Sequence, residues 1–188
     1  MNLKKATLII CVVWISIISI WVIRNEIILH NGREVLLKTV PVDPRDILMG
    51  DYVILNYEIG QMDLNNGSNY AQVFSKSGQK RYVSVGKYEL NKQVYTKLST
   101  DENDIAYIEE VYDKKPNNNH LYLKGKMSKC DTVNPLWKNG KCIKYGIESY
   151  YVKEKTGLEL EKNLRNGTLV KVSIDRNGNA KVKGFVSK

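Results

Sequence analysis

The sequence predicts a mainly β protein: an N-terminal transmembrane helix, then a mostly antiparallel, sandwich-like β domain that carries one C-terminal α-helix. Three observations predict this fold class. Residues 6–23 are apolar apart from Thr7, Ser16 and Ser19. Later segments alternate apolar and polar residues, as half-buried strands do. Asn-Gly pairs, which favour tight turns between strands, begin at positions 31, 66, 139, 166 and 177.

The apolar run is long enough to cross a membrane. At about 1.5 Å per residue it spans about 27 Å, close to the thickness of a bilayer's hydrocarbon core. It is longer than the core of a usual signal peptide, and no small-x-small cleavage site follows it, so we expect an uncleaved anchor. Only Lys4 and Lys5 are basic before Arg24. The positive-inside rule therefore predicts a cytoplasmic N-terminus and an external domain.

These features predict four regions along the chain. They are a cytoplasmic tail at 1–5, the anchor at 6–23, a juxtamembrane helix extension or linker at 24–32, and an external β-rich domain at 33–188. The helix is expected to stop at Asn31-Gly32, because glycine commonly ends helices.

The chain is basic, with 29 Lys and Arg against 20 Asp and Glu and a net charge of +9. Lysines dispersed along the predicted strands are typical of a solvated face. Attraction to anionic lipid or wall polymer is the next interpretation, and it requires the lysines to gather on one surface. No basic cluster is interleaved with aromatic residues, so we expect no nucleic-acid partner.

The first half of the domain is predicted to hold an alternating central strand. Residues 33–40 form the strand before it, and a turn at Pro44 leads to Tyr52. From Tyr52 onward one face is apolar and is expected to point to the core; it comprises Val53, Leu55, Tyr57 and Ile59. Residues 65–79 are expected to form a mobile insert.

Further strands are predicted at 81–85, 93–98 and 105–112. The clearest alternation follows, with Leu121, Leu123, Gly125 and Met127 facing inward and Tyr122, Lys124 and Lys126 facing outward. Another strand is predicted to run through Ile143, Tyr145, Ile147, Ser149 and Tyr151.

The C-terminal region is predicted to hold the domain's helix and a hairpin. Thr156 and Glu159 form a capping box, and the helix ends at Asn166-Gly167. In the hairpin, Val170, Val172 and Ile174 must share a face with Ala180, Val182 and Gly184. A two-residue Asn-Gly loop would bring Lys181 to that face, so we predict a three-residue loop at 176–178 with a glycine bulge at Gly178.

The cysteines and histidines limit which disulfide and metal sites the domain can form. Cys130 and Cys142 bracket a loop between two predicted strands. In an external domain they can form a disulfide, and two unpaired thiols are the alternative. His30 and His120 are the only histidines, too few beside the cysteines for a zinc site. We expect neither a metal nor a cofactor.

No catalytic constellation is predicted either. No serine lies between Gly32 and Gly67, so a nucleophile of the kind found in signal-peptidase-like enzymes is missing near the central motif. Asp43, Asp46 and Asp51 lack the regular spacing of a calcium loop. We interpret them as turn caps, with Arg45 neutralising one of them.

Two separated motifs resemble one family. Residues Gly50, Asp51, Tyr52, Leu55 and Tyr57 reproduce the pattern that names the GDYXXLXY protein family, a group of bacterial membrane-anchored proteins of unassigned function. The preceding Asp43, Pro44, Arg45 and Asp46 are similar to that family, as is the later run of Tyr145, Gly146, Ile147 and Glu148. The resemblance implies a location and a shared fold but no catalytic residues. It also implies a multi-pass membrane protein as partner, because members are often encoded beside one.

The sequence therefore predicts a non-catalytic, single-pass accessory or interaction protein of the bacterial cell envelope. One alternative is an envelope enzyme, such as a signal-peptidase-like hydrolase, which requires a polar cleft near Asp43, Arg45 and Asp51 that holds a distant lysine or serine. The other alternative is a binder of anionic wall polymer or lipid headgroups, whose binding would weaken steeply with salt.

Overall fold

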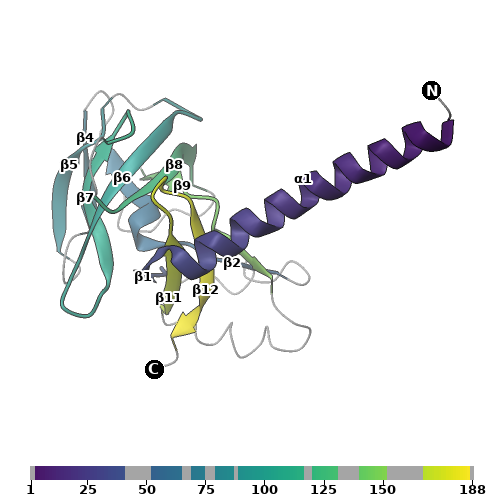
Figure 1. Ribbon diagram of the computed structural model, residues 1–188. Coiled ribbons are helices and arrows are strands. Elements are labelled where there is room, and N and C mark those ends of the chain that lie inside the picture. Colours follow the sequence, from purple (N-terminus) through teal and green to yellow (C-terminus); the bar gives the residue numbers. More distant parts are fainter. Residues whose placement is uncertain are drawn as a thin grey trace.

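The computed structural model describes residues 3–40, 52–64, 69–74, 79–86, 89–116, 120–130, 140–151 and 167–186. Figure 1 shows a β domain from which one long helix projects. Two predicted features lie outside the described residues: the C-terminal helix after Thr156, and the motif segment from Asp43 to Asp51.

The helix α1 (Leu3–Asn31) extends well beyond the predicted membrane segment. Its portion Thr7–Asn31 is long and apolar enough to cross a membrane, and the apolar window within it is not buried inside the structure. Apolar side chains are exposed from Leu8 to Ile23. The domain covers only the end of the helix, where Ile28 is buried.

Close contact with the domain ends the helix. The Gly32 N–H donates to the Ile28 carbonyl at 3.1 Å, and the Ser173 hydroxyl donates to the same oxygen at 2.5 Å. A Cβ at position 32 would lie 2.2 Å from Ser173 Oγ and 2.6 Å from the Ile28 carbonyl oxygen. Glycine is needed here because the helix and the domain approach too closely for any side chain.

A three-stranded antiparallel sheet receives the chain from the helix. Its order is β1 (Arg33–Lys38), β11 (Leu169–Ile174) and β12 (Ala180–Val186). The predicted hairpin register is confirmed: Ile174 lies opposite Ala180, and Val172 opposite Val182. The loop closes through Asp175 and Asn179, and Gly178 has a φ of +77°.

One detail of that hairpin differs from the prediction. A bulge follows Val182, so that Lys171 pairs with Gly184 and Val170 pairs with Phe185. Simple alternation had placed Gly184 with the inward set. The extra residue lets the large Phe185 ring pack against the core instead.

The second sheet has seven antiparallel strands, and Figure 1 shows that it is strongly curved. Its order is β5 (Lys80–Ser84), β4 (Tyr70–Phe74), β3 (Gln61–Leu64), β9 (Gly140–Lys144), β8 (Tyr122–Lys129), β6 (Gln93–Thr100) and β7 (Ala106–Tyr112). The prediction of a mobile insert at 65–79 is wrong for residues 70–74, which form β4 between two neighbours.

The central motif forms less strand than its alternation predicts. Only β2 (Tyr52–Ile54) is a strand, and a 3₁₀ turn, η2 (Glu58–Gly60), follows. The burial pattern is nevertheless as predicted, because the four residues on the predicted core face are all buried: Val53, Leu55, Tyr57 and Ile59.

Two further strand predictions need correction. The expected single strand from Ile143 to Tyr151 is split into β9 and β10 (Ser149–Tyr151), and Gly146 between them has a φ of +80°. Tyr122 was expected to face solvent, yet it is buried. The tip of the β11–β12 hairpin covers it: the Tyr122 hydroxyl donates to the Arg176 carbonyl at 2.9 Å.

Candidate functional site

The two sequence motifs meet in one junction. Strand β2 pairs antiparallel with β10, so that Tyr52 lies opposite Tyr151 and Val53 opposite Tyr150. Directly after this pair, the Leu55 N–H donates to the Glu148 carbonyl at 2.7 Å. Segments about ninety residues apart in the sequence therefore form one structural unit, which we call the motif junction: residues 52–60 and 143–151.

Two buried tyrosines hold the motif junction together. The Tyr57 hydroxyl donates to the Ile147 carbonyl at 2.9 Å. The Tyr145 hydroxyl lies 2.9 Å from the Ile59 carbonyl and 3.1 Å from the Thr96 hydroxyl. Burial raises the pKa of both phenols above the ordinary value, because a charged phenolate would lose its hydration. Both hydroxyls therefore form hydrogen bonds between segments that are distant in the sequence.

Glu148 organises the turn that separates β9 from β10. Its carboxylate accepts the N–H of Tyr145 through one oxygen and the N–H of Gly146, at 2.8 Å, through the other. A carboxylate that accepts two N–H groups stabilises a tight turn. This turn places Tyr145, Gly146 and Glu148 at the space beside α1.

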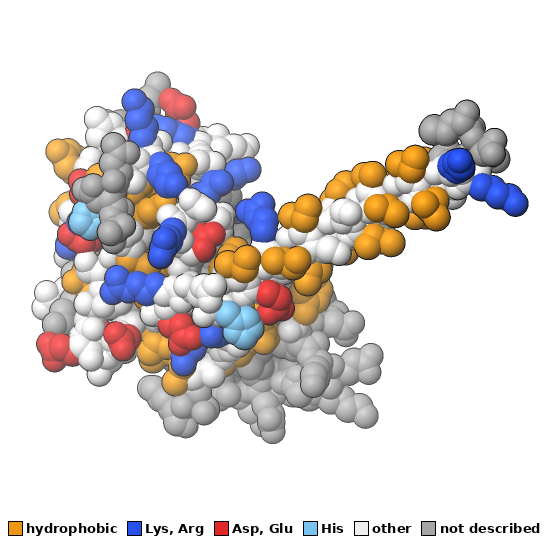
Figure 2. Space-filling view, viewed as in Figure 1, with side chains coloured by type: hydrophobic (Ala, Val, Ile, Leu, Met, Phe, Trp, Pro, Cys, Tyr) orange, Lys and Arg blue, Asp and Glu red, His pale blue; other side chains and the backbone are white. Residues whose placement is uncertain are grey.

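An open groove of about 650 Å³ lies between the end of α1 and the outer face of β8 and β9. Five cationic residues line it: Arg24, Lys124, Lys126, Lys144 and Lys181. Among the described residues that line it, the one acidic residue is Glu148, whose carboxylate accepts hydrogen bonds within the turn. We call this the juxtahelical groove. Figure 2 shows Lys and Arg side chains gathered on the domain where the helix emerges.

Several lysines of the groove lie close together on one surface. Lys126 on β8 pairs directly with Lys144 on β9, and Lys124 lies two residues before Lys126, on the same exposed face. The sequence predicted dispersed, solvated lysines, whereas the fold concentrates these on one surface.

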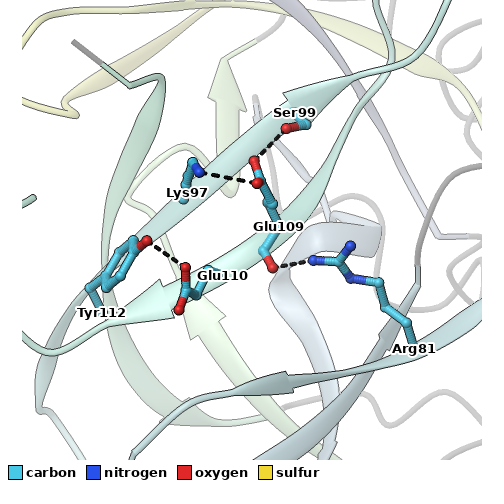
Figure 3. A network of polar contacts seen from close by, with 6 residues as sticks. All are labelled: Arg81, Lys97, Ser99, Glu109, Glu110 and Tyr112. Carbon is cyan, nitrogen blue, oxygen red and sulfur yellow. Dashed lines mark hydrogen bonds and ion pairs between the residues drawn. The ribbon is translucent and has the colours of Figure 1, made fainter. Parts of the chain in front are cut away.

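A second polar cluster lies on β6 and β7 (Figure 3). A bulge beside Lys97 brings Glu109 to the same side as Lys97 and Ser99. The Glu109 carboxylate accepts the Ser99 hydroxyl at 2.6 Å and the Lys97 ammonium at 3.0 Å. These two hydrogen bonds lower its pKa. A carboxylate with a lowered pKa is a weak base, so this geometry does not activate the serine as a nucleophile.

The same cluster closes the curled sheet. The Arg81 guanidinium, on edge strand β5, donates to the Glu109 carbonyl on the opposite edge strand, β7. A neighbouring contact joins Tyr112 to Glu110 and raises the pKa of the Tyr112 phenol to about 12. We therefore interpret the cluster as a structural seam between the two edges.

Cys130 and Cys142 are joined by a disulfide with a Cα–Cα distance of 5.2 Å. This is one of the two alternatives that the sequence leaves open. The bond ties the end of β8 to β9, beside the motif junction. Cys11 is an exposed free thiol in α1. In the described part of the chain, no three His, Cys, Asp or Glu side chains converge as a metal site would require.

The structure places the predicted motif residues unequally. Leu55, Tyr57, Tyr145 and Ile147 are buried in the core, and Gly146 and Glu148 form the turn at the groove. Tyr52 is described as part of β2. The other motif residues, namely Asp43, Pro44, Arg45, Asp46, Gly50 and Asp51, lie outside the described residues.

Sequence reasoning missed the juxtahelical groove. Its one local signal was the outward spacing of Lys124 and Lys126 in the clearest strand. The approach of Lys144 depends on the pairing of β8 with β9, and that of Arg24 on the seating of the helix.

The fold and the junction define a class: a β-rich domain carried directly on one long apolar helix. The chain belongs to the GDYXXLXY protein family, whose sequence profile matches residues 14–185. Comparisons with curated proteins and with solved structures give no match.

Proposed function

We propose that this protein is a non-catalytic accessory module of the bacterial cell envelope, anchored by α1 as a single-pass helix and serving a multi-pass membrane protein. The observation that carries the proposal is the direct junction between helix and domain. Ile28 is buried against the domain, and its carbonyl accepts hydrogen bonds from both Gly32 and Ser173. A domain fixed in this way keeps one orientation at a membrane surface.

The surface of the helix supports a role within the membrane. Trp14 is 61% exposed and Trp21 is 65% exposed, and the residues between them are isoleucines apart from Ser16 and Ser19. A helix that is apolar on all sides suits contact with lipid or with other apolar helices. A multi-pass protein offers such helices.

The charges and the disulfide support an external domain. Lys4 and Lys5 precede the apolar run, whereas Arg24 is followed closely by Glu26, which favours a cytoplasmic N-terminus. Disulfides persist in oxidising compartments outside the cytosol. The Cys130–Cys142 bond agrees with that orientation.

The motif junction supports a structural or interaction role for the family motifs. Its tyrosine hydroxyls bond backbone carbonyls, and its glutamate caps a turn. The rigid junction displays Tyr151, which is 78% exposed on β10. Exposed tyrosines on rigid strands are common anchors of protein interfaces.

Photocrosslinking in native membranes tests the proposal. A photoreactive residue at Tyr151 is expected to capture one multi-pass membrane protein, identified by mass spectrometry. The matched control places the same residue at Tyr82, which is 68% exposed on β5, away from the junction. Capture at Tyr151 without capture at Tyr82 supports the partner. Identical products from both positions, or no membrane protein from either, would contradict the proposal.

A further inference from the structure

We propose that the juxtahelical groove binds the phosphate of an anionic phospholipid headgroup. This inference rests on the part of the proposed function that places α1 in the membrane, and it is independent of the protein partner. It assigns a ligand class to a surface whose cationic residues lie outside both family motifs.

The position of the groove matches the headgroup layer. Arg24, which lines the groove, directly follows the last residue of the apolar run, Ile23. Ile28, the groove residue at the domain, comes about 6 Å further along the helix axis. The polar layer on each side of a bilayer is about 5–8 Å thick. The groove therefore opens at the depth where lipid phosphates lie.

The charge of the groove suits an anionic ligand. Among the described residues that line it, five are cationic and one, Glu148, is acidic, and the Glu148 carboxylate already accepts two N–H groups. Lys124 and Lys126 both lie on the exposed face of β8. A phosphate beside Arg24 and these two lysines would offset the repulsion among their charges, and a guanidinium can hold phosphate oxygens in a bidentate manner.

The helix also offers a path for acyl chains. Ile20 precedes Arg24 by four residues and Ile17 precedes it by seven, so the three share one helix face. Both isoleucines are more than half exposed. Ile28 continues the same face into the groove. A lipid whose phosphate contacts Arg24 can therefore lay an acyl chain along this stripe, which a free phosphate ion could not use.

Native mass spectrometry of the full-length protein in a neutral detergent tests the site. The probes are phosphatidylglycerol and phosphatidylcholine with identical acyl chains. The groove variant is K124Q/K126Q, and the matched control is K114Q/K115Q, which removes the same charge from exposed positions outside the groove. We expect preferential binding of phosphatidylglycerol, a loss of about tenfold or more in the groove variant, and a change of less than about twofold in the control.

Each other outcome overturns the proposal. Equal losses in both variants would indicate general charge attraction, and no loss in the groove variant would move the lipid elsewhere. Complete displacement of lipid by millimolar inorganic phosphate would indicate a soluble anion as the ligand. Stronger binding of soluble polyglycerol phosphate than of lipid would indicate a wall polymer. Both side chains are exposed, so K124Q/K126Q is expected to unfold at no lower temperature than the wild type.

Partner capture and lipid binding can fail separately. The lipid assay uses purified protein, so a missing protein partner cannot affect its result. Conversely, crosslinking from Tyr151 does not depend on the groove lysines. Alkaline extraction of native membranes reports on the anchor alone, and release of the protein by that treatment would overturn both proposals.

Discussion

At the scale of single residues, the buried tyrosines make the motif junction sensitive to alkali. The phenol of Tyr57 is buried and bonded to the Ile147 carbonyl, and its pKa is raised. Above about pH 10 the unfolded chain releases a tyrosine proton that the folded protein keeps. The free energy of unfolding therefore falls as pH rises, by about 1.4 kcal/mol per pH unit for each such tyrosine.

Tyr57→Phe is expected to remove one of these contributions. Near neutral pH the free energy of unfolding of the variant should be about 1 kcal/mol lower than that of the wild type, because the Ile147 carbonyl loses its hydrogen-bond donor. Between about pH 10 and 12, its stability should fall less steeply than that of the wild type. Urea unfolding of the detergent-solubilised protein measures both effects. Tyr82→Phe, at an exposed position, should keep the wild-type pH dependence, and an unchanged slope in the Tyr57 variant would refute the assignment.

At the scale of elements, the β11–β12 hairpin depends on one glycine. Gly178 has a φ of +77°, and a Cβ there would lie 2.7 Å from the Tyr122 ring. Gly178→Ala should lower the free energy of unfolding by about 2–4 kcal/mol, because the backbone would be strained and the added Cβ would crowd the Tyr122 ring. Gly184→Ala is the matched control, because no atom lies within 4 Å of its added Cβ. Equal losses of thermal stability in the two variants would contradict the predicted role of the turn.

The disulfide is expected to stabilise the β8–β9 pair by restricting the unfolded chain. Its cysteines are twelve residues apart in the sequence, and closure of a loop of this size contributes about 3 kcal/mol in the chain-entropy view. C130A/C142A should therefore unfold at a markedly lower denaturant concentration than the wild type. Cys11→Ala should not change the domain, since Cys11 is exposed on α1. A reductant should reproduce the loss in the wild type and leave the double variant unaffected.

Elements whose local pattern agrees with their tertiary setting were predictable from the sequence. The hairpin register followed from alternation and turn length, because a one-residue slip would have buried Lys181. The predicted strand through Ile143 and Tyr151 failed at Gly146, whose left-handed backbone breaks the alternation. Strand β4 was missed because it is only five residues long and its neighbours in the sheet supply its stability. Propensity is weak in such short strands.

The candidate site was less predictable than the fold. Residues of the motif junction were recognisable from the sequence, yet their pairing joins segments about ninety residues apart. The juxtahelical groove needs the β8–β9 register and the seating of α1 before its cations converge. Both the register and the seating of the helix depend on contacts between segments that are distant in the sequence. The positions of the lysines in the sequence do not show which strands become neighbours in the sheet.

At the scale of the whole molecule, the relation between helix and domain decides what the groove faces. The helix has no flexible linker to the domain: β1 begins at Arg33, directly after Gly32. The Ile28 carbonyl is held from both sides, by Gly32 and by Ser173. The domain can therefore hold its groove and its motif junction at a fixed distance and angle from α1.

Gly32→Ala is expected to loosen that relation without unfolding the domain. The added Cβ would meet Ser173 Oγ at 2.2 Å and the Ile28 carbonyl oxygen at 2.6 Å, so the helix end has to shift. Spin labels on the native Cys11 and on Tyr82→Cys, both exposed, report the helix–domain distance by pulsed dipolar spectroscopy in lipid nanodiscs. The wild type should give a narrow distribution and the variant a broader or displaced one, with Gly184→Ala as the control. Because the groove forms between the two parts, the same variant should also bind phosphatidylglycerol more weakly. A narrow, unshifted distribution in Gly32→Ala would show that the junction does not set the orientation of the domain.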